Sequence, residues 1–160
     1  MAKNMQFVVF NIGKEFYGVP IEAVSEIVRV PDVTAVPDAP DFFEGVINLR
    51  GRIVPVVDLR ARLRLPREER TRSSRVLITE NGGRVIGLMV DAVSEVRKLP
   101  VEAVEPPPEM IAAVGIEYIT GVAKVGERLI IFLDMKRILS VEDMKKVVST
   151  VEQAANTAAA

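Results

Sequence analysis

Apolar and polar positions alternate along most of the chain in the period-two pattern that predicts short β-strands. Apolar runs at 7–10 and 16–19 flank the turn residue Gly13, and the stretch "EIVRV" at 26–30 alternates as a half-exposed strand would. Further strand patterns lie at 46–47, 53–57, 75–90 and 118–135. Within the third of these, Asn81-Gly82 predicts a type I′ hairpin turn, since that turn needs positive φ at both central residues.

Helical patterns are few and short. Pro20 is suited to the first position of a turn of helix over 21–25. Leu59, Leu63 and Leu65 lie near one face of a predicted helix in "DLRARLRL". A capping box at Ser140 and a stripe of apolar residues predict a C-terminal helix; the stripe consists of Val141, Met144, Val147, Val148 and Val151.

The two halves of the chain repeat one another. Gly18 corresponds to Gly87, "AVSE" at 23–26 to "AVSE" at 92–95, Pro31 to Pro100, Gly45-Val46 to Gly121-Val122, and Asp58 to Asp134. The order is kept over five successive elements, so we expect a mainly β fold of two similar five-stranded barrels. The predicted subdomains cover about 14–70 and 75–140, with the N-terminal strand and the C-terminal helix packing across them. Two such small barrels would stabilise each other by packing together, and a groove would remain between them.

Charge argues against binding to nucleic acid. The 160 residues include 21 basic and 22 acidic side chains, a net charge of −1, and few aromatic residues on which bases could stack. A local basic run is interleaved with Glu68 and Glu69, and we interpret it as a solvated helix and loop. The run comprises Arg60, Arg62, Arg64, Arg67, Arg70, Arg72 and Arg75.

The absence of cysteine and histidine removes most catalytic chemistry. Disulfides, serine–histidine–aspartate triads and the commonest metal ligand are excluded, and no glycine-rich phosphate loop precedes a helix. We therefore predict a protein that is not an enzyme and that has no cofactor and no metal. No apolar segment approaches the roughly 20 residues of a membrane helix, which favours a cytoplasmic protein.

Four carboxylates are candidates for a catalytic or ligand-binding role. Asp58 and Asp134 occupy equivalent positions at strand–helix junctions, where the simplest interpretation is a helix N-cap. Glu26 and Glu44 could form a carboxylate pair beside the groove, which leaves a small-ligand module as an alternative function. No spacing along the chain decides how far apart these side chains lie.

The segment "EGVINLRGRIVPVVDL" at 44–59 raises a different possibility, which is recognition of a partner. Its insert "NLRG" at 48–51 reads as neither a minimal hairpin turn nor a hydrophobic strand. Arg50 next to Gly51 could project a permanently charged, rigid guanidinium from the rim of a barrel. A solvated arginine of no special role is the alternative.

The segment "FFEGVINLRGRIVPVVDLR" closely resembles the signature segment of the CheW family of bacterial chemotaxis adaptors. "EFYGVPIEAVSEI", "GLMVDAVSEV" and "YITGVAKVGERLIIFLDM" resemble other segments of that family, so the resemblance covers about residues 5–140. It implies two intertwined five-stranded barrels of the SH3-like type. It also implies a non-enzymatic scaffold that couples transmembrane chemoreceptors to the histidine kinase CheA.

The resemblance also implies where the partners bind. The receptor's cytoplasmic hairpin tip is expected to dock near the groove between the barrels. The regulatory domain of CheA is expected to bind elsewhere, and the resemblance assigns no residues of this chain to that surface. The positions that match the family's receptor-binding motif are Val24, Glu26, Gly45 and Arg50, with Ile21 and Val46 as neighbours. A CheW-like coupling protein of a kinase pathway other than chemotaxis remains an alternative that the sequence does not separate.

Overall fold

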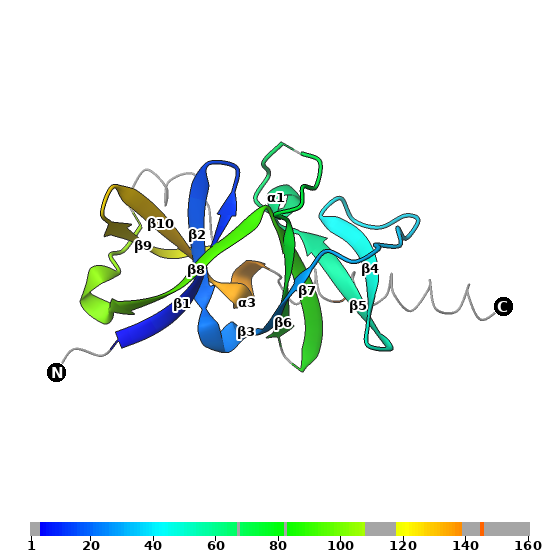
Figure 1. Cartoon of the computed structure of the whole chain (residues 1–160), viewed down its shortest axis with the longest axis horizontal. Helices are drawn as coiled ribbons and strands as arrows, with labels where there is room; N and C mark the ends of the chain where they lie inside the picture. Colours follow the sequence, from blue (N-terminus) through cyan, green and yellow to red (C-terminus); the bar gives the residue numbers. More distant parts are fainter. Residues whose placement is uncertain (1–3, 67, 82, 108–117, 139–144, 146–160) are drawn as a thin grey trace.

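The computed structural model describes residues 4–66, 68–81, 83–107, 118–138 and 145, and within them the fold is mainly β, as predicted. Ten strands form two five-stranded sheets that lie side by side along the long axis of the molecule (Figure 1). The strands are β1 (Asn4–Ile12), β2 (Glu15–Pro20), β3 (Val24–Arg29), β4 (Phe43–Leu49), β5 (Arg52–Asp58), β6 (Arg75–Asn81), β7 (Arg84–Val90), β8 (Ala92–Pro100), β9 (Ile119–Val125) and β10 (Arg128–Leu133).

Short helices connect or follow the strands. They are the 3-10 turns η1 (Ile21–Ala23) and η2 (Val101–Ala103) and the α-helices α1 (Leu59–Arg62) and α3 (Met135–Ile138). The predicted helix after Pro20 is thus one 3-10 turn. The helix predicted in "DLRARLRL" ends at Arg62, so Leu63 and Leu65 lie beyond it, but both are half-buried against the core that buries Leu59. The predicted C-terminal helix falls on residues 140–151, which lie outside the described residues apart from Lys145.

The internal repeat is visible in the sheet topology. Sheet A has the strand order β8-β1-β2-β10-β9 and sheet B the order β3-β6-β7-β5-β4. When β6–β10 are numbered as a second copy of β1–β5, both sheets read third-first-second-fifth-fourth. Each sheet takes the first and second strands of one repeat and the third, fourth and fifth strands of the other, so the repeats are intertwined. The sheets therefore do not follow the expected division at 14–70 and 75–140.

The repeats join at two places in each sheet, and one of these two is a parallel strand pair. Strand β10 pairs with β2 in sheet A, and β5 pairs with β7 in sheet B. All other ladders are antiparallel. Because each repeat supplies strands to both sheets, neither sheet can form from one half of the described chain alone.

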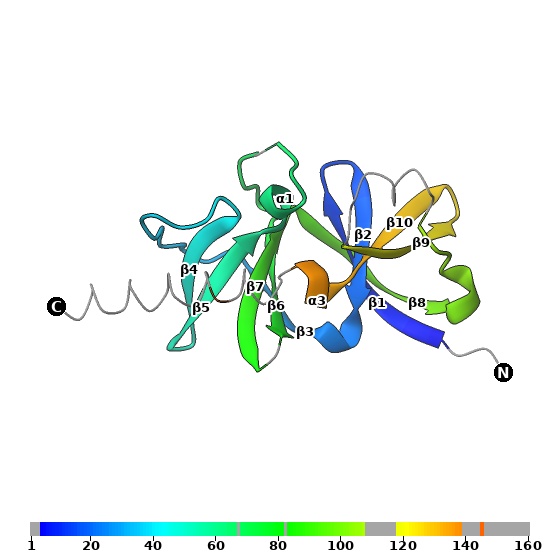
Figure 2. The ribbon, with the colours of Figure 1, turned by 180° about the vertical axis from the view of Figure 1, so that it is seen from behind.

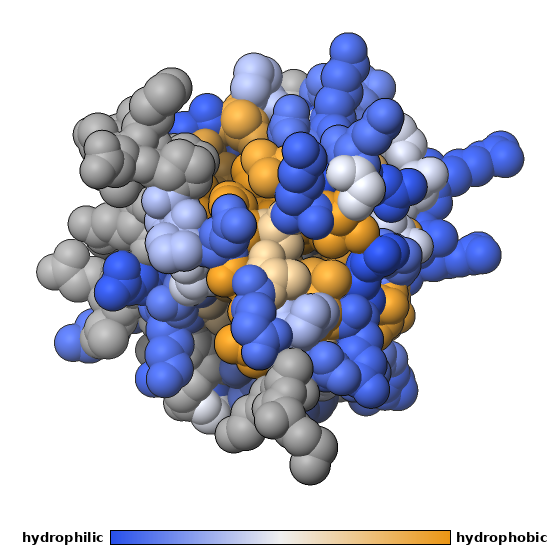
Figure 3. All heavy atoms as spheres, turned by 90° about the vertical axis from the view of Figure 1, so that its left-hand side faces the viewer, coloured by the Kyte–Doolittle hydropathy of each residue, from blue (hydrophilic) through white to orange (hydrophobic). Residues whose placement is uncertain are grey.

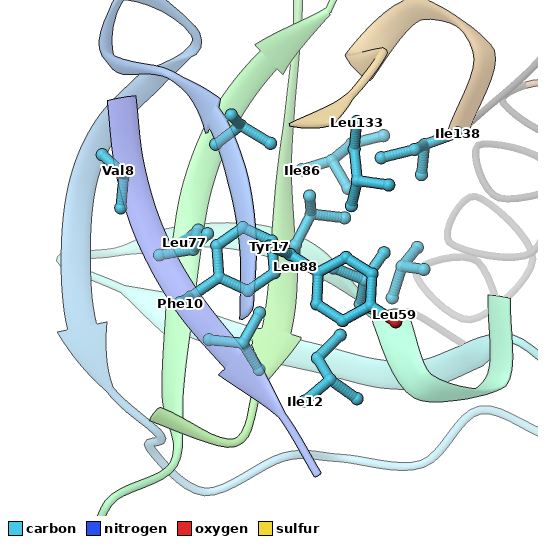
Figure 4. Packing of buried hydrophobic residues seen from close by; sticks show 13 residues of the cluster. Val8, Phe10, Ile12, Tyr17, Leu59, Leu77, Ile86, Leu88, Leu133 and Ile138 are labelled. Carbon is cyan, nitrogen blue, oxygen red and sulfur yellow. The ribbon is translucent and has the colours of Figure 1, made fainter. Parts of the chain in front are cut away.

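Three apolar clusters follow from this arrangement. One lies in sheet A around Phe7 and Phe132, whose ring centroids are 4.4 Å apart, and another lies in sheet B around Ile47 and Val76. The largest lies between the sheets, where Phe10 and Tyr17 stack among aliphatic side chains from both (Figure 4). Helix α3 lies between the sheets in both ribbon views, and its Ile138 belongs to this cluster (Figure 2).

One predicted turn is shifted by a residue. Asn81 is the last residue of β6 and pairs with Arg84 of β7, so the hairpin turn follows Asn81 and includes Gly83, whose φ is +79°. The prediction that Asn81 is itself a central turn residue is therefore wrong. Two adjacent glycines after the asparagine offer left-handed φ at no steric cost, so strand pairing decides which pair of residues turns.

A candidate partner-docking surface

Arg50 lies in a two-residue turn between β4 and β5. Leu49 pairs with Arg52, and the two residues between them, Arg50 and Gly51, have φ of +51° and +86°. Positive φ at both central residues is the signature of a type I′ hairpin. The expectation that "NLRG" is not a minimal turn is therefore wrong, because Asn48 and Leu49 belong to β4 and Asn48 closes the turn by accepting a hydrogen bond from the Gly51 N–H at 2.8 Å.

The conformation of Arg50 is unusual for its residue type. A non-glycine residue with left-handed φ costs roughly 1–2 kcal/mol, and asparagine or glycine is the usual occupant. The corresponding position in the second repeat is Gly126, with φ of +62°. The equivalent left-handed position thus carries glycine in one repeat and arginine in the other, so the need for positive φ does not explain the arginine.

The Arg50 guanidinium is held by Glu26 of β3, the strand at the opposite end of the sheet B strand order from β4. Its two terminal nitrogens donate to the two carboxylate oxygens of Glu26, each at 2.6 Å. The Arg50 side chain remains 69 % exposed. These hydrogen bonds and the opposite charge hold the pKa of Glu26 below its usual value and raise the pKa of Arg50. The result is a fixed, exposed ion pair between two residues that lie 24 positions apart.

The other predicted site residues fall into two groups. Ile21 of η1 and Val24 of β3 are half-buried and pack on the central core cluster. They belong to the same η1–β3 segment as Glu26. Gly45 is buried and Val46 half-buried in the middle of β4, where Val46 exchanges two backbone hydrogen bonds with Thr34. An added Cβ on Gly45 would lie 2.3 Å from the carbonyl oxygen of Thr34, which gives this glycine a packing role.

An apolar groove of about 700 Å³ reaches η1, the turn that precedes β3. Pro20 and Ala23 line it, and Val24 follows Ala23 directly in the chain. The groove is lined by Met5, Phe7, Pro20, Glu22, Ala23, Val101, Val104, Thr120, Phe132, Leu133, Asp134, Met135 and Lys136. It therefore draws on β1, β2, η1, η2, β9, β10 and α3, and offers a partner a mostly hydrophobic wall that reaches the turn preceding β3, the strand of Glu26.

Each of the four candidate carboxylates has an identified hydrogen-bond or ion-pair partner. The Asp58 carboxylate accepts from the Arg60 N–H at 3.0 Å and caps α1, and Asp134 accepts from the Lys136 N–H at 2.9 Å in the equivalent position. Both N-cap predictions are confirmed. Glu26 and Glu44 pair with different arginines, Glu26 with Arg50 and Glu44 with Arg70 at 2.6 Å, so they do not form a carboxylate pair.

The basic run is not uniformly solvated. The Arg60 side chain is only 7 % exposed and donates to both carboxylate oxygens of Asp91, at 2.5 and 3.3 Å. It also donates to the Pro66 carbonyl and to Glu68. The prediction of a solvated arginine is wrong at Arg60, because its guanidinium is needed to join α1 to the β7–β8 junction.

Arg62 is also engaged with neighbouring groups. Its guanidinium lies 5.2 Å from the ring centroid of Phe42 and 4.9 Å from that of Tyr118, and it donates to the Ile138 carbonyl. Phe42 and Tyr118 are themselves equivalent in the two repeats. No sequence signal distinguishes Arg60 or Arg62 from the exposed arginines nearby, whereas comparing the two β-hairpin turns of the repeats would have singled out Arg50.

No group of three or more acidic, histidine or cysteine side chains that could hold a metal occurs among the residues that the structure describes. None of the helices in the described ranges has both the length and the hydropathy needed to cross a bilayer.

The comparison with known proteins agrees with the geometry. The model of the CheW-like domain matches residues 6–143. The chain belongs to the CheW family. It is 39 % identical over 141 residues to a chemotaxis protein CheW of Klebsiella aerogenes, covering 88 % of this chain and 85 % of that protein. A chemotaxis protein CheW of Treponema pallidum is 36 % identical, with 90 % of this chain and 87 % of that protein covered.

A solved structure supports the same assignment. The scaffolding protein TtCheW of Thermoanaerobacter tengcongensis matches with a TM-score of 0.78 and 35 % identity, over 89 % of this chain and 92 % of that chain. CheW-family membership confirms the function predicted from the signature segment, which is a non-enzymatic scaffold of chemotaxis signalling that couples receptors to CheA.

Proposed function

We propose that this CheW-family scaffold acts in the cytoplasm and binds the receptor's hairpin tip at the Glu26–Arg50 ion pair and the adjoining groove. The observation that carries this proposal is Arg50 itself. It occupies a left-handed position that the second repeat fills with glycine, and its side chain is exposed and fixed by Glu26. An exposed ion pair contributes little to stability, and a conformational cost at such a residue is typical of a role in recognition.

The surface suits an amphipathic helical partner. Apolar side chains of one helix face can enter the groove lined by residues such as Phe7, Val101 and Met135. The Glu26–Arg50 pair presents both charges at the rim, so it would set the register of the partner and disfavour partners with mismatched charges. Ile21 and Val24 support this rim from beneath by packing on the central core. Gly45 and Val46 contribute by holding β4 against Thr34.

Replacing Arg50 with asparagine tests the proposal. Asparagine tolerates positive φ, so the thermal midpoint of Arg50→Asn should equal or exceed that of the unmodified protein. Affinity for a receptor hairpin-tip fragment should fall roughly thirtyfold, as expected for the loss of a well-placed charged contact. Calorimetric titration with the fragment, together with thermal unfolding, measures both quantities.

Arg52→Asn is the matched control. Arg52 is also exposed and lies two residues away in the same hairpin, at the start of β5. Its replacement should leave affinity for the fragment within about twofold. Equal affinity of the Arg50→Asn variant and the unmodified protein would remove Arg50 from the receptor site and leave the family assignment standing.

For the kinase we propose a separate surface at the end of the molecule formed by sheet A. Apolar side chains gather in the middle of this end, with polar ones around them (Figure 3). Val96 of β8 and Leu129 of β10 are 51 and 46 % exposed. Exposed apolar residues gathered in this way favour a protein interface.

Leu129→Glu should separate the two partners. Leu129 lies on β10 next to the Gly126 turn, which is the sheet A counterpart of the hairpin that carries Arg50. A charge placed among apolar contacts should weaken binding of the CheA regulatory domain at least tenfold and leave receptor-fragment affinity unchanged. Pull-down and titration with each partner separately measure this. Loss of both interactions together, with an intact thermal transition, would contradict the assignment of separate surfaces.

A further inference from the structure

Two methionines line the apolar groove beside the receptor-docking surface. Met5 lies near the start of β1 and is 40 % exposed, and Met135 is the first residue of α3 and is half-buried. Their thioethers are part of the wall that an apolar partner would cover. A thioether is soft and adaptable, which suits a surface that accommodates another protein.

Methionine is also the most readily oxidised residue in this chain. The sequence has no cysteine, tryptophan or histidine, and it has six methionines. Met89, in contrast to Met5, is 7 % exposed and packs in the core cluster of sheet B. A dissolved oxidant therefore reaches the groove while Met89 is shielded.

We propose that Met5 and Met135 form an oxidation site through which a hydroperoxide weakens partner binding in the groove; this inference rests on the proposed receptor-docking function. In the reaction with hydrogen peroxide, a sulfur lone pair attacks one peroxide oxygen. An S–O bond forms, the O–O bond breaks, and the departing oxygen takes up a proton to become water. The sulfur is oxidised by two electrons to a sulfoxide, and the peroxide is reduced.

The sulfoxide would be poorly accommodated under a bound partner. Its oxygen is a hydrogen-bond acceptor; among the polar side chains lining the groove, Glu22 and Asp134 offer carboxylates, and Lys136 offers an ammonium that is exposed to solvent. The Thr120 hydroxyl already donates to the carbonyl of Phe132 at 3.3 Å. A partner with an apolar face supplies no donor of its own, so a sulfoxide oxygen beneath it would lose its hydrogen bonds to water, which opposes binding. The free protein pays no such cost at Met5, because water reaches that side chain.

Treating the full chain with hydrogen peroxide and titrating it with the receptor hairpin-tip fragment tests the inference. Peptide mass spectrometry should find sulfoxide at Met5 and Met135, and affinity should fall roughly tenfold with the thermal midpoint unchanged. Methionine sulfoxide reductase should restore the affinity. Bound fragment should also slow oxidation of Met5 by covering it.

Leucine variants identify the responsible residues. Met5→Leu/Met135→Leu should bind the fragment before and after peroxide with nearly equal affinity. Met110→Leu/Met144→Leu, which removes two other methionines, should remain as sensitive as the unmodified protein. Unchanged affinity in a protein that carries sulfoxide at both groove methionines would overturn the oxidation site. A fragment that does not bind even the untreated protein would instead overturn the docking function on which it rests.

Discussion

Gly45→Ala is expected to destabilise the protein by about 4 kcal/mol or more, the largest effect that we predict for any single methyl group added to this chain. Gly45 has φ of +152°, and an added Cβ would lie 2.3 Å from the Thr34 carbonyl oxygen and 2.7 Å from a methyl carbon of Val33. Real Cβ contacts are not that short, and backbone atoms move less easily than side chains. The alanine would therefore separate β4 from the 33–34 segment and break the two 2.9 Å hydrogen bonds between Thr34 and Val46.

Alanine substitutions at two other glycines provide reference values for this loss of stability. Gly51 has φ of +86° but nothing within 4 Å of an added Cβ, so Gly51→Ala should cost only the conformational term of about 1–2 kcal/mol. Gly121, the counterpart of Gly45, would place its Cβ 2.7 Å from the Glu105 carbonyl oxygen, and its alanine variant should fall between the two. Denaturant unfolding measures all three. A Gly45→Ala variant as stable as Gly51→Ala would show that the contact with Thr34 relaxes without cost.

Arg60→Met is expected to destabilise the fold by about 2–3 kcal/mol. The substitution removes the guanidinium that pairs with Asp91 and donates to the Pro66 carbonyl, and leaves the Asp91 carboxylate with the Gly13 N–H at 2.7 Å. Breaking a fully buried ion pair costs about 3–5 kcal/mol, and the estimate is lower here because the Asp91 side chain is 37 % exposed and water screens it.

Matched variants separate charge from geometry at Arg60. Arg60→Lys keeps the charge but cannot reach both Asp91 oxygens and the Pro66 carbonyl at once, so its loss of stability should be intermediate. Arg72→Met removes an exposed arginine of the same basic run and should change the free energy of unfolding by less than about 0.5 kcal/mol. Equal stability of the Arg60 and Arg72 variants would show that the buried pair contributes nothing net.

The Arg60–Asp91 pair should also give the fold an acid-sensitive component. Burial opposes ionisation of Asp91, but hydrogen bonds from Arg60 and the Gly13 N–H, with the Arg60 charge, outweigh it and hold the pKa of Asp91 below its usual value. A depressed folded-state pKa contributes stability above the unfolded-state pKa of about 3.9, and this is lost as the pH falls through the folded-state value. Unfolding free energies measured across that acidic range should fall less steeply for Arg60→Met than for the unmodified protein.

Much of the fold could be predicted from local pattern. Alternating apolar positions and turn residues located strands at 7–10 and 16–19 and the helix after Asp58, because a strand or helix needs only its own residues to present an apolar face. The internal repeat could be detected for the same reason, because equivalent strands and helices need glycines and helix N-caps at equivalent positions. The signature segment around Arg50 led to the correct family, because it combines a constrained turn with flanking strands.

Residues brought together over long distances were less predictable. Arg60 and Arg72 belong to the same basic run, yet one is buried and the other exposed. The difference arises from Asp91, which lies 31 positions from Arg60 and reaches it only when β7 is in place. The pairing of Arg50 with Glu26 could not be predicted for the same reason, because the two residues meet only when the whole sheet has assembled.

The sequence by itself determined a mainly β chain of two similar halves, because apolar periodicity and turn residues act locally. Only the tertiary structure decided that the halves exchange strands, with β1 and β2 in one sheet and β3–β5 in the other. Similar repeats present similar strand edges, so local pattern favours pairing within a repeat no more than between repeats. The choice is made by the packing of both sheets around the shared core of Phe10, Tyr17 and their neighbours, which no single segment contains.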